Sequence, residues 1–127
     1  FVKDRLFAAL NLNDKEMSLY NAVAQILEKN LSSPDMVIFL HSDTDRLMQN
    51  IKNRGRDYEK SIDWKYIDAL NEIYNEFFFR YDASPLMIIN TNDIDFVHNK
   101  NDLEEIIQFI RTPGEGTRYY NPLKSLI

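Results

Sequence analysis

The stretch Met36-Val-Ile-Phe-Leu40 decides the fold, because it is a continuous apolar run between polar and chain-breaking residues. Pro34 precedes it, and the polar segment 41–44 follows it. A short run rich in β-branched residues between such boundaries predicts a strand that is buried on both faces, as parallel sheets require. The run Leu86-Met-Ile-Ile89 follows Pro85 and predicts a second strand of this kind.

Helical patterns flank and separate the two predicted strands. Asn13-Asp-Lys-Glu16 has the form of a capping box, and apolar residues at helical spacing then predict a helix over 14–30. A second helix is predicted to end near Asn53, and a long one to begin at about Asp63. Another capping box, Asn101-Asp-Leu-Glu104, predicts the start of the last helix. Strands separated by helices imply right-handed crossovers and a parallel sheet with helices on its faces.

The chain has 127 residues, which is enough for one domain with one core. Its net charge of −5 argues against a partner as long and anionic as a nucleic acid polymer. We expect no membrane partner, because no apolar run approaches the length of a membrane span. The chain contains no cysteine, which is compatible with a reducing cytoplasm, and we expect a cytoplasmic protein.

Two strands are too few for a stable sheet, so the remaining strands are expected from outside this chain or from a segment that shows no recognisable strand pattern. The first residue, Phe1, is not a methionine, and the pattern that it opens begins in the middle of an element. We therefore expect the chain to be a portion of a longer polypeptide.

The segment Asn50-Ile-Lys-Asn-Arg-Gly-Arg-Asp-Tyr-Glu-Lys-Ser-Ile62 places two arginines on either side of one glycine, just past a predicted helix. Guanidinium groups match phosphate oxygens two at a time, and glycine allows both side chains to reach one anion. A phosphate clamp is therefore one interpretation, and a solvated basic turn that ends the helix is the other. The loops 41–44 and 91–99 follow the predicted strands, and ligands gather at that edge of an α/β sheet.

Two absences narrow the chemistry. The chain has no G-x-x-x-x-G-K-[ST] segment, which a P-loop needs to hold a nucleoside triphosphate. His41 and His98 are its only histidines, and neither has a partner at ligand spacing, so no metal site is predicted.

The segment 50–62, with Trp64-Lys-Tyr66 after it, resembles the lid of the deoxynucleoside kinases. Residues 34–40 resemble the strand before that lid, and Asn90-Thr-Asn-Asp-Ile-Asp-Phe96 resembles the loop that packs on the adenine of ATP. The resemblance spans residues 1–111 and implies the C-terminal part of a P-loop kinase-like, three-layer α/β fold with a parallel sheet and a helical lid. Residues 112–127 are expected to form an extended tail or linker.

The resemblance also implies roles for residues of the lid. Arg54 and Arg56 are expected to contact the phosphates during transfer, and Glu59 to accept a hydrogen bond from the deoxyribose 3′-hydroxyl. The family usually has an arginine where this chain has Asn50, so one phosphate contact is expected to come from elsewhere.

Outside the lid, the resemblance places Asp4 at the nucleoside base, and Asp95 and Phe96 at the adenine of ATP. It implies ATP and Mg²⁺, with most of the metal ligands outside this chain, and a homodimer. The P-loop lysine and the general base are expected before Phe1.

The function expected from the resemblance is transfer of the γ-phosphoryl group of ATP to the 5′-hydroxyl of a purine deoxynucleoside by the longer protein, with this chain inactive by itself. Two alternatives stay open. One is a nucleoside monophosphate kinase similar to thymidylate kinase, which shares the architecture and a basic lid. The other is a non-catalytic interaction domain that keeps part of the kinase fold.

Overall fold

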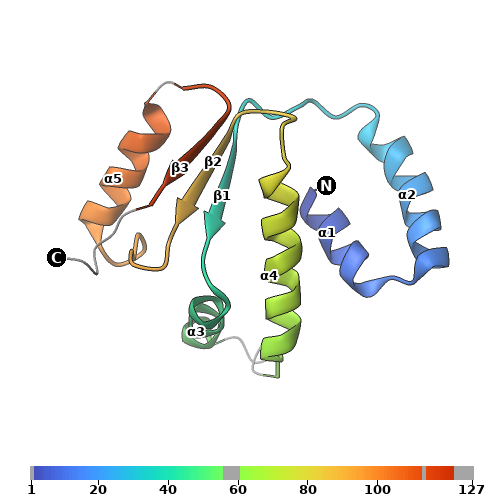
Figure 1. Cartoon of the computed structure of the whole chain (residues 1–127), viewed down its shortest axis with the longest axis horizontal. Helices are drawn as coiled ribbons and strands as arrows, with labels where there is room; N and C mark the ends of the chain where they lie inside the picture. Colours follow the sequence, from blue (N-terminus) through green and yellow to red (C-terminus); the bar gives the residue numbers. More distant parts are fainter. Residues whose placement is uncertain (1, 56–60, 113, 122–127) are drawn as a thin grey trace.

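The computed structural model describes residues 2–55, 61–112 and 114–121, and its centre is a parallel sheet. The described strands are β1 (Val37–His41), β2 (Leu86–Asn90) and β3 (Thr117–Tyr120), in the order β1-β2-β3 (Figure 1). Phe39 lies opposite Ile88, and Ile88 lies opposite Tyr119. The two strands and the parallel pairing predicted from the sequence are confirmed.

The third strand, β3, is a finding that the sequence did not predict. It lies in the segment expected to be an extended tail or linker, and the missing strands were expected either from outside the chain or from a segment with no recognisable strand pattern. The backbone N–H of Leu86 donates to the carbonyl of Gly116 over 3.0 Å, just before β3 begins. β3 escaped prediction because an edge strand of four residues with Thr117 and Arg118 at its start carries no continuous apolar run.

Helices cover both faces of the sheet, which gives the three layers that were expected (Figure 1). α4 lies against one face and α5 against the other, while α1 and α2 form a pair beside α4. None of the described helices is long and apolar enough to cross a membrane. The helices are α1 (Val2–Asn11), α2 (Asp14–Glu28), α3 (Thr44–Arg54), α4 (Trp64–Phe79) and α5 (Lys100–Arg111).

The cap of α2 follows the sequence prediction, and the cap of α5 does not. The capping box at Asn13 is confirmed, because its side chain accepts from the backbone N–H of Glu16 over 2.9 Å and the Glu16 side chain accepts from Asn13 in return. The box predicted at Asn101 is wrong: α5 begins two residues earlier, with Asn99 as its N-cap. The reason is that Asp102, inside the predicted box, is buried and bonds the preceding loop instead.

An aromatic layer holds α4 on the sheet. The ring of Phe39 stacks on that of Phe78 with 4.6 Å between centroids, and the ring of Tyr74 lies 6.2 Å from Phe39. Stacked pairs of this kind contribute about 0.5–1.5 kcal/mol beyond the area that they bury. Burial also raises the pKa of the Tyr74 hydroxyl. The layer fixes the helix that follows the arginine segment.

The opposite face of the sheet is covered by α5 only in part. Ile89 is fully buried and packs with Ile94 and Ile106 in one cluster. Leu40 lies beside Ile89 on the same face but is 46% exposed. The prediction that both strands are buried on both faces is therefore correct for β2 and wrong for β1, because α5 covers β2 and β3 and leaves this side of β1 open.

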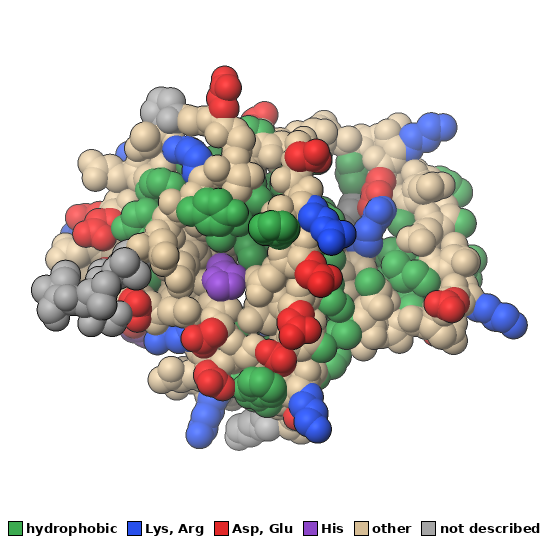
Figure 2. Space-filling view, viewed as in Figure 1, with side chains coloured by type: hydrophobic (Ala, Val, Ile, Leu, Met, Phe, Trp, Pro, Cys, Tyr) green, Lys and Arg blue, Asp and Glu red, His purple; other side chains and the backbone are tan. Residues whose placement is uncertain are grey.

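A groove of about 410 Å³ lies between α4 and the ends of the strands. Figure 2 shows hydrophobic side chains gathering around a hollow in this face of the molecule. Phe79, at the end of α4, is 80% exposed at the groove, whereas its neighbour Phe78 is buried. The groove is lined by Phe39, His41, Asn75, Phe78, Phe79, Ile88, Asn90, Tyr119, Tyr120 and Asn121.

Candidate functional site

The loops after β1 and β2 leave the sheet at the same edge, as the sequence predicts. His41 and Asn90 are paired at the last position of the two strands. Beyond them, the backbone N–H and the hydroxyl of Thr91 both donate to the carbonyl of His41, over 2.7 and 3.0 Å. Ligands bind at this edge in open α/β sheets, so the two loops form the base of the candidate site.

A buried polar layer joins the two loops to α4. The hydroxyls of Ser42 and Thr91 are hydrogen-bonded to each other, and both residues are buried. The Asn71 amide on α4 donates to the carbonyl of Ser42 over 3.1 Å. The buried Thr44 hydroxyl donates to the Asp68 carboxylate over 2.6 Å. Buried polar groups with partners on several elements hold those elements in one arrangement.

The start of α3 is fixed on the second loop. The Asp43 side chain caps α3 by accepting from the backbone N–H of Arg46 over 2.8 Å. The backbone N–H of Asp43 in turn donates to the side-chain carbonyl of Asn92 over 2.9 Å. The helix that leads to the arginine segment is therefore attached at its first turn to the loop after β2.

The end of α3 presents the first of the predicted lid arginines. Arg54 is the last residue of the helix and is exposed. Gly55 ends the helix with φ of 68°, a left-handed conformation that glycine adopts without strain. Asn50, which stands where the resembling family usually has arginine, is exposed on α3. Arg56 and Glu59 lie outside the described residues.

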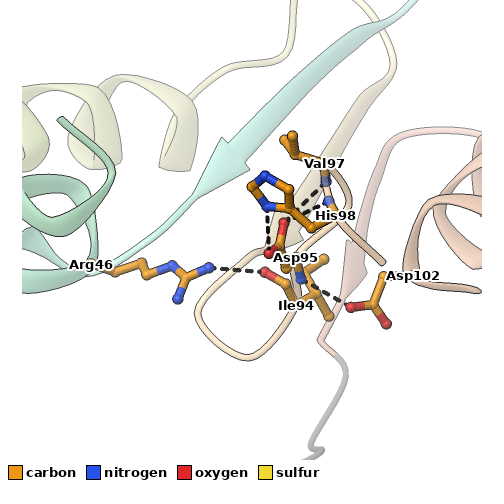
Figure 3. A network of polar contacts seen from close by, with 6 residues as sticks. All are labelled: Arg46, Ile94, Asp95, Val97, His98 and Asp102. Carbon is orange, nitrogen blue, oxygen red and sulfur yellow. Dashed lines mark hydrogen bonds and ion pairs between the residues drawn. The ribbon is translucent and has the colours of Figure 1, made fainter. Parts of the chain in front are cut away.

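The loop after β2 closes on the side chain of Asp95 (Figure 3). Asp95 Oδ1 accepts from the backbone N–H groups of Val97 and His98 over 3.1 and 3.0 Å. The His98 Nδ1 lies 2.9 Å from Asp95 Oδ2. These donors, the backbone N–H of His98 first, lower the pKa of the Asp95 carboxyl below its usual value. The carboxylate predicted to lie at the adenine of ATP is therefore engaged within its own loop.

The same loop is anchored to α5 and to the core. The backbone N–H of Asp95 donates to the Asp102 carboxylate over 2.9 Å, and Asp102 is only 3% exposed. Phe96 packs, half-buried, against the cluster of Ile89, Ile94 and Ile106. Asp95 and Phe96 thus lie at the edge of the sheet, on a loop that is attached to α5.

Asp4 lies on α1 and is bound to the neighbouring helix. Its carboxylate accepts from the Tyr20 hydroxyl over 2.5 Å, which raises the pKa of Tyr20. At the other end of α1, the Asn11 amide donates to the hydroxyl of Tyr66 near the start of α4. The end of α1 thus contacts the helix that follows the arginine segment, and the Asp4 carboxylate is bound to Tyr20 on α2. The role predicted for Asp4 stays a prediction.

Sequence reasoning missed several residues of this edge, among them Asn71, Asp102 and Arg46. Each is polar and stands in a helix or loop where solvent exposure is the ordinary expectation. Ser42 differs from them, because it lies in the loop 41–44 that was predicted to lie at this edge. In the part of the chain that the structure describes, no group of three or more His, Cys, Asp or Glu side chains is placed to hold a metal ion.

The chain is similar in sequence to known deoxynucleoside kinases. The model of the deoxynucleoside kinase family matches residues 2–113. A deoxyadenosine kinase of Lactobacillus acidophilus is 30% identical over 122 residues, covering 85% of this chain and 57% of the relative. A deoxyguanosine kinase of Bacillus subtilis is 28% identical over 113 residues, covering 86% of this chain and 55% of the relative.

A solved structure agrees with the fold. Deoxyadenosine kinase from M. mycoides with bound dCTP superimposes with a TM-score of 0.74 and 26% identity, covering 87% of this chain and 60% of that one. The chain belongs to the deoxynucleoside kinase family, and the family and fold expected from its sequence are confirmed. It spans little more than half the length of these two curated relatives.

Proposed function

We propose that the natural protein containing this chain is a deoxynucleoside kinase, which transfers the γ-phosphoryl group of ATP to the 5′-hydroxyl of a purine deoxynucleoside. The observation that carries the proposal is the family match over residues 2–113, joined to a sheet edge that leads into the arginine segment. The relatives named deoxyadenosine and deoxyguanosine kinase support the purine preference.

Positioning and charge stabilisation supply most of the catalysis in phosphoryl transfer. Arg54 stands at the end of α3, and α3 is fixed at its first turn by Asp43 and Asn92. We propose that Arg54 and Arg56 hold the negative charge that develops on the transferring group. Their planar forks suit phosphate oxygens better than a lysine ammonium does.

The nucleoside is proposed to be recognised through Glu59 and Asp4. Glu59 accepts a hydrogen bond from the 3′-hydroxyl, and Asp4 contacts the base. If Glu59 reads the 3′-hydroxyl, Glu59→Ala lowers kcat/KM for a deoxynucleoside about 10-fold or more but leaves the poor 3′-deoxy analogue almost unchanged. Equal losses on the two substrates would show that Glu59 does not read that hydroxyl.

The base of ATP is proposed to lie on the loop after β2. The Asp95 carboxylate already accepts hydrogen bonds from Val97 and His98, so we propose that it acts by shaping the loop rather than by direct contact. Phe96 contributes an aromatic ring held on the Ile94 cluster. The ligands of Mg²⁺ are proposed to lie mostly outside this chain, and in the ranges that the structure describes no group of three or more His, Cys, Asp or Glu side chains could hold a metal ion.

Phosphorylation of deoxyadenosine, deoxyguanosine, deoxycytidine and the matching monophosphates by the natural protein tests the proposal. We expect ATP-dependent formation of a purine deoxynucleoside monophosphate. Transfer to monophosphates alone would identify the thymidylate kinase-like alternative, and no transfer to any acceptor would favour the interaction domain. The 127-residue chain alone is expected to be inactive, because it has no G-x-x-x-x-G-K-[ST] segment.

Substitution of Arg56 tests the proposed role of the arginine segment in phosphoryl transfer. Arg56→Ala in the natural protein is expected to lower kcat about 10²- to 10³-fold while the KM of the nucleoside changes little, because the group acts on the transition state. Lys52→Ala is the matched control, since Lys52 is also basic and in the last turn of α3. An unchanged kcat in Arg56→Ala would refute the role of the clamp. The homodimer stays a prediction.

A further inference from the structure

α3 is held on the rest of the protein by its first residue. Of the residues of α3, all of which the structure describes, only Thr44 is buried. The last turn of the helix is exposed, and it ends at Arg54. Figure 1 shows α3 beyond the end of β1, next to the first half of α4. The anchor of α3 therefore lies at one end of the helix, and the arginine lies at the other.

The anchor is a hydrogen bond rather than an apolar contact. The Thr44 hydroxyl donates to Asp68 Oδ1 over 2.6 Å. The Asn71 amide, one turn further along α4, donates to the carbonyl of Ser42 over 3.1 Å and lies 3.4 Å from the Thr44 hydroxyl. Valine would fill the place of Thr44 without needing a partner, but apolar contacts have no preferred direction. The bond between Thr44 and Asp68 therefore fixes how α3 is oriented on α4, as well as where it starts.

The length of α3 makes its orientation important at Arg54. Arg54 follows Thr44 by ten residues, which is about 15 Å along the axis of a helix. Tilting α3 by about 10° about its first turn would displace its last residue by roughly 2.6 Å. Misplacing a group that acts on the reaction by about 1 Å can lower the rate about 100-fold. A small change of geometry at Thr44 is therefore large enough at Arg54 to affect catalysis.

We propose that Thr44 and Asp68 are positioning residues for phosphoryl transfer: their hydrogen bond sets the orientation of α3 and so the place of the Arg54 guanidinium. The inference rests on the proposed function and deepens it, because it names the contact through which α4 orients the arginine. Loss of the bond is expected to act on kcat through Arg54, and to leave the binding of ATP at the loop after β2 almost unchanged.

The test compares variants of the natural protein that separate the hydrogen bond from the shape of the side chains. Thr44→Val removes the hydroxyl at nearly constant volume, and Asp68→Ala removes the acceptor. Each is expected to lower kcat about 10- to 100-fold and to change KM for ATP less than about three-fold. Thr44→Ser keeps a donor and Asp68→Asn keeps an acceptor, so both should hold kcat within about three-fold of wild type.

Glu72→Ala is the matched control, because Glu72 is an exposed acidic residue on the same helix as Asp68. Its kcat is expected to stay within about two-fold of wild type. Thermal unfolding of every variant shows that it is folded at the temperature of the assay. If Asp68→Ala does not fold, Thr44→Val takes its place.

A double-mutant cycle shows whether the bond acts through the arginine. Asp68→Ala is combined with Arg54→Ala, and kcat is measured for the wild type, both single variants and the double variant. The factor by which Asp68→Ala lowers kcat should be at least about three-fold smaller when Arg54 is already absent, because the group that the bond positions is gone. Equal factors with and without Arg54 would overturn the inference, since the bond would then be a structural contact only.

Two further results would overturn the positioning role. One is a kcat within two-fold of wild type in both Thr44→Val and Asp68→Ala, and the other is an equal loss in Thr44→Ser and Asp68→Asn. The proposed function survives either result if the wild-type protein phosphorylates a deoxynucleoside. A wild-type protein that transfers no phosphoryl group to a deoxynucleoside would overturn the proposed function as well.

Discussion

Trp64 and Asp45 join the two helices that border the arginine segment. The indole Nε1 of Trp64 donates to Asp45 Oδ1 over 2.8 Å. Trp64 is the first residue of α4, and Asp45 lies in the first turn of α3, so the bond spans the arginine segment in sequence. The start of α4 is therefore held beside the same turn of α3 that the loop after β2 also contacts.

The bond between Trp64 and Asp45 is expected to be measurable by a double-mutant cycle. Trp64→Phe and Asp45→Ala each remove one partner, and chemical denaturation gives the free energy of unfolding of each variant. We expect a coupling energy of about 0.5–1.5 kcal/mol, the usual net contribution of a hydrogen bond. Strictly additive variants would show that the contact does not stabilise this arrangement.

Gly55 ends α3 in a conformation that side chains disfavour. Its φ is 68°, and a Cβ built there would have no neighbour within 4 Å, so the cost of substitution is conformational rather than steric. Gly55→Ala is expected to lower the free energy of unfolding by about 1 kcal/mol, and Gly55→Asn by less, because asparagine tolerates this region. Thermal unfolding of the three proteins checks the order Gly, Asn, Ala. An alanine variant as stable as wild type would mean that α3 ends differently.

The sequence predicted the elements whose signals are local. The apolar run of β1 and the capping box at Asn13 are properties of a few adjacent residues, and both are confirmed. β3 was not predicted, because its place in the sheet depends on pairing with β2, more than 25 residues earlier in the chain. The cap of α5 was misplaced for a similar reason, since the partner of Asp102 lies in the preceding loop.

The position of the candidate site was predictable from the sequence, but the side-chain contacts within it were not. The meeting of the two loops follows from parallel strands, whose carboxyl ends share an edge. The contacts made there by Arg46 and Asn71 depend on how α3 and α4 are rotated, which the spacing of apolar residues does not specify for polar positions. The roles of Arg56 and Glu59 came from resemblance and stay predictions.

Acid is expected to loosen the loop after β2 through Asp95. Its carboxyl has a folded-state pKa below the ordinary value of 3.8, mainly because the backbone N–H of His98 donates to it. A lowered folded-state pKa stabilises the fold at pH values above the unfolded-state pKa, and this stabilisation is lost as the pH falls through the folded-state pKa.

The Asp95→Asn variant lacks this titration. The stability difference between wild type and variant should therefore be constant from pH 7 to about 5 and shrink below about pH 4. A difference that grows on acidification would contradict the assignment.

The loop after β2 is expected to depend on one buried side chain for its attachment. Ile94 is 4% exposed and packs with Ile89 and Ile106, whereas Val97 on the same loop is 73% exposed. Ile94→Ala should lower the free energy of unfolding by about 2–4 kcal/mol, because it removes three buried carbons and leaves a cavity. Val97→Ala, the matched control, should change it by less than about 0.5 kcal/mol. Denaturant unfolding measures both, and hydrogen exchange of the amides of Asp95 and His98 reports the loop itself. If the loop packs as described, exchange accelerates in Ile94→Ala and not in Val97→Ala; equal effects of the two substitutions would show that the loop is not held by this cluster.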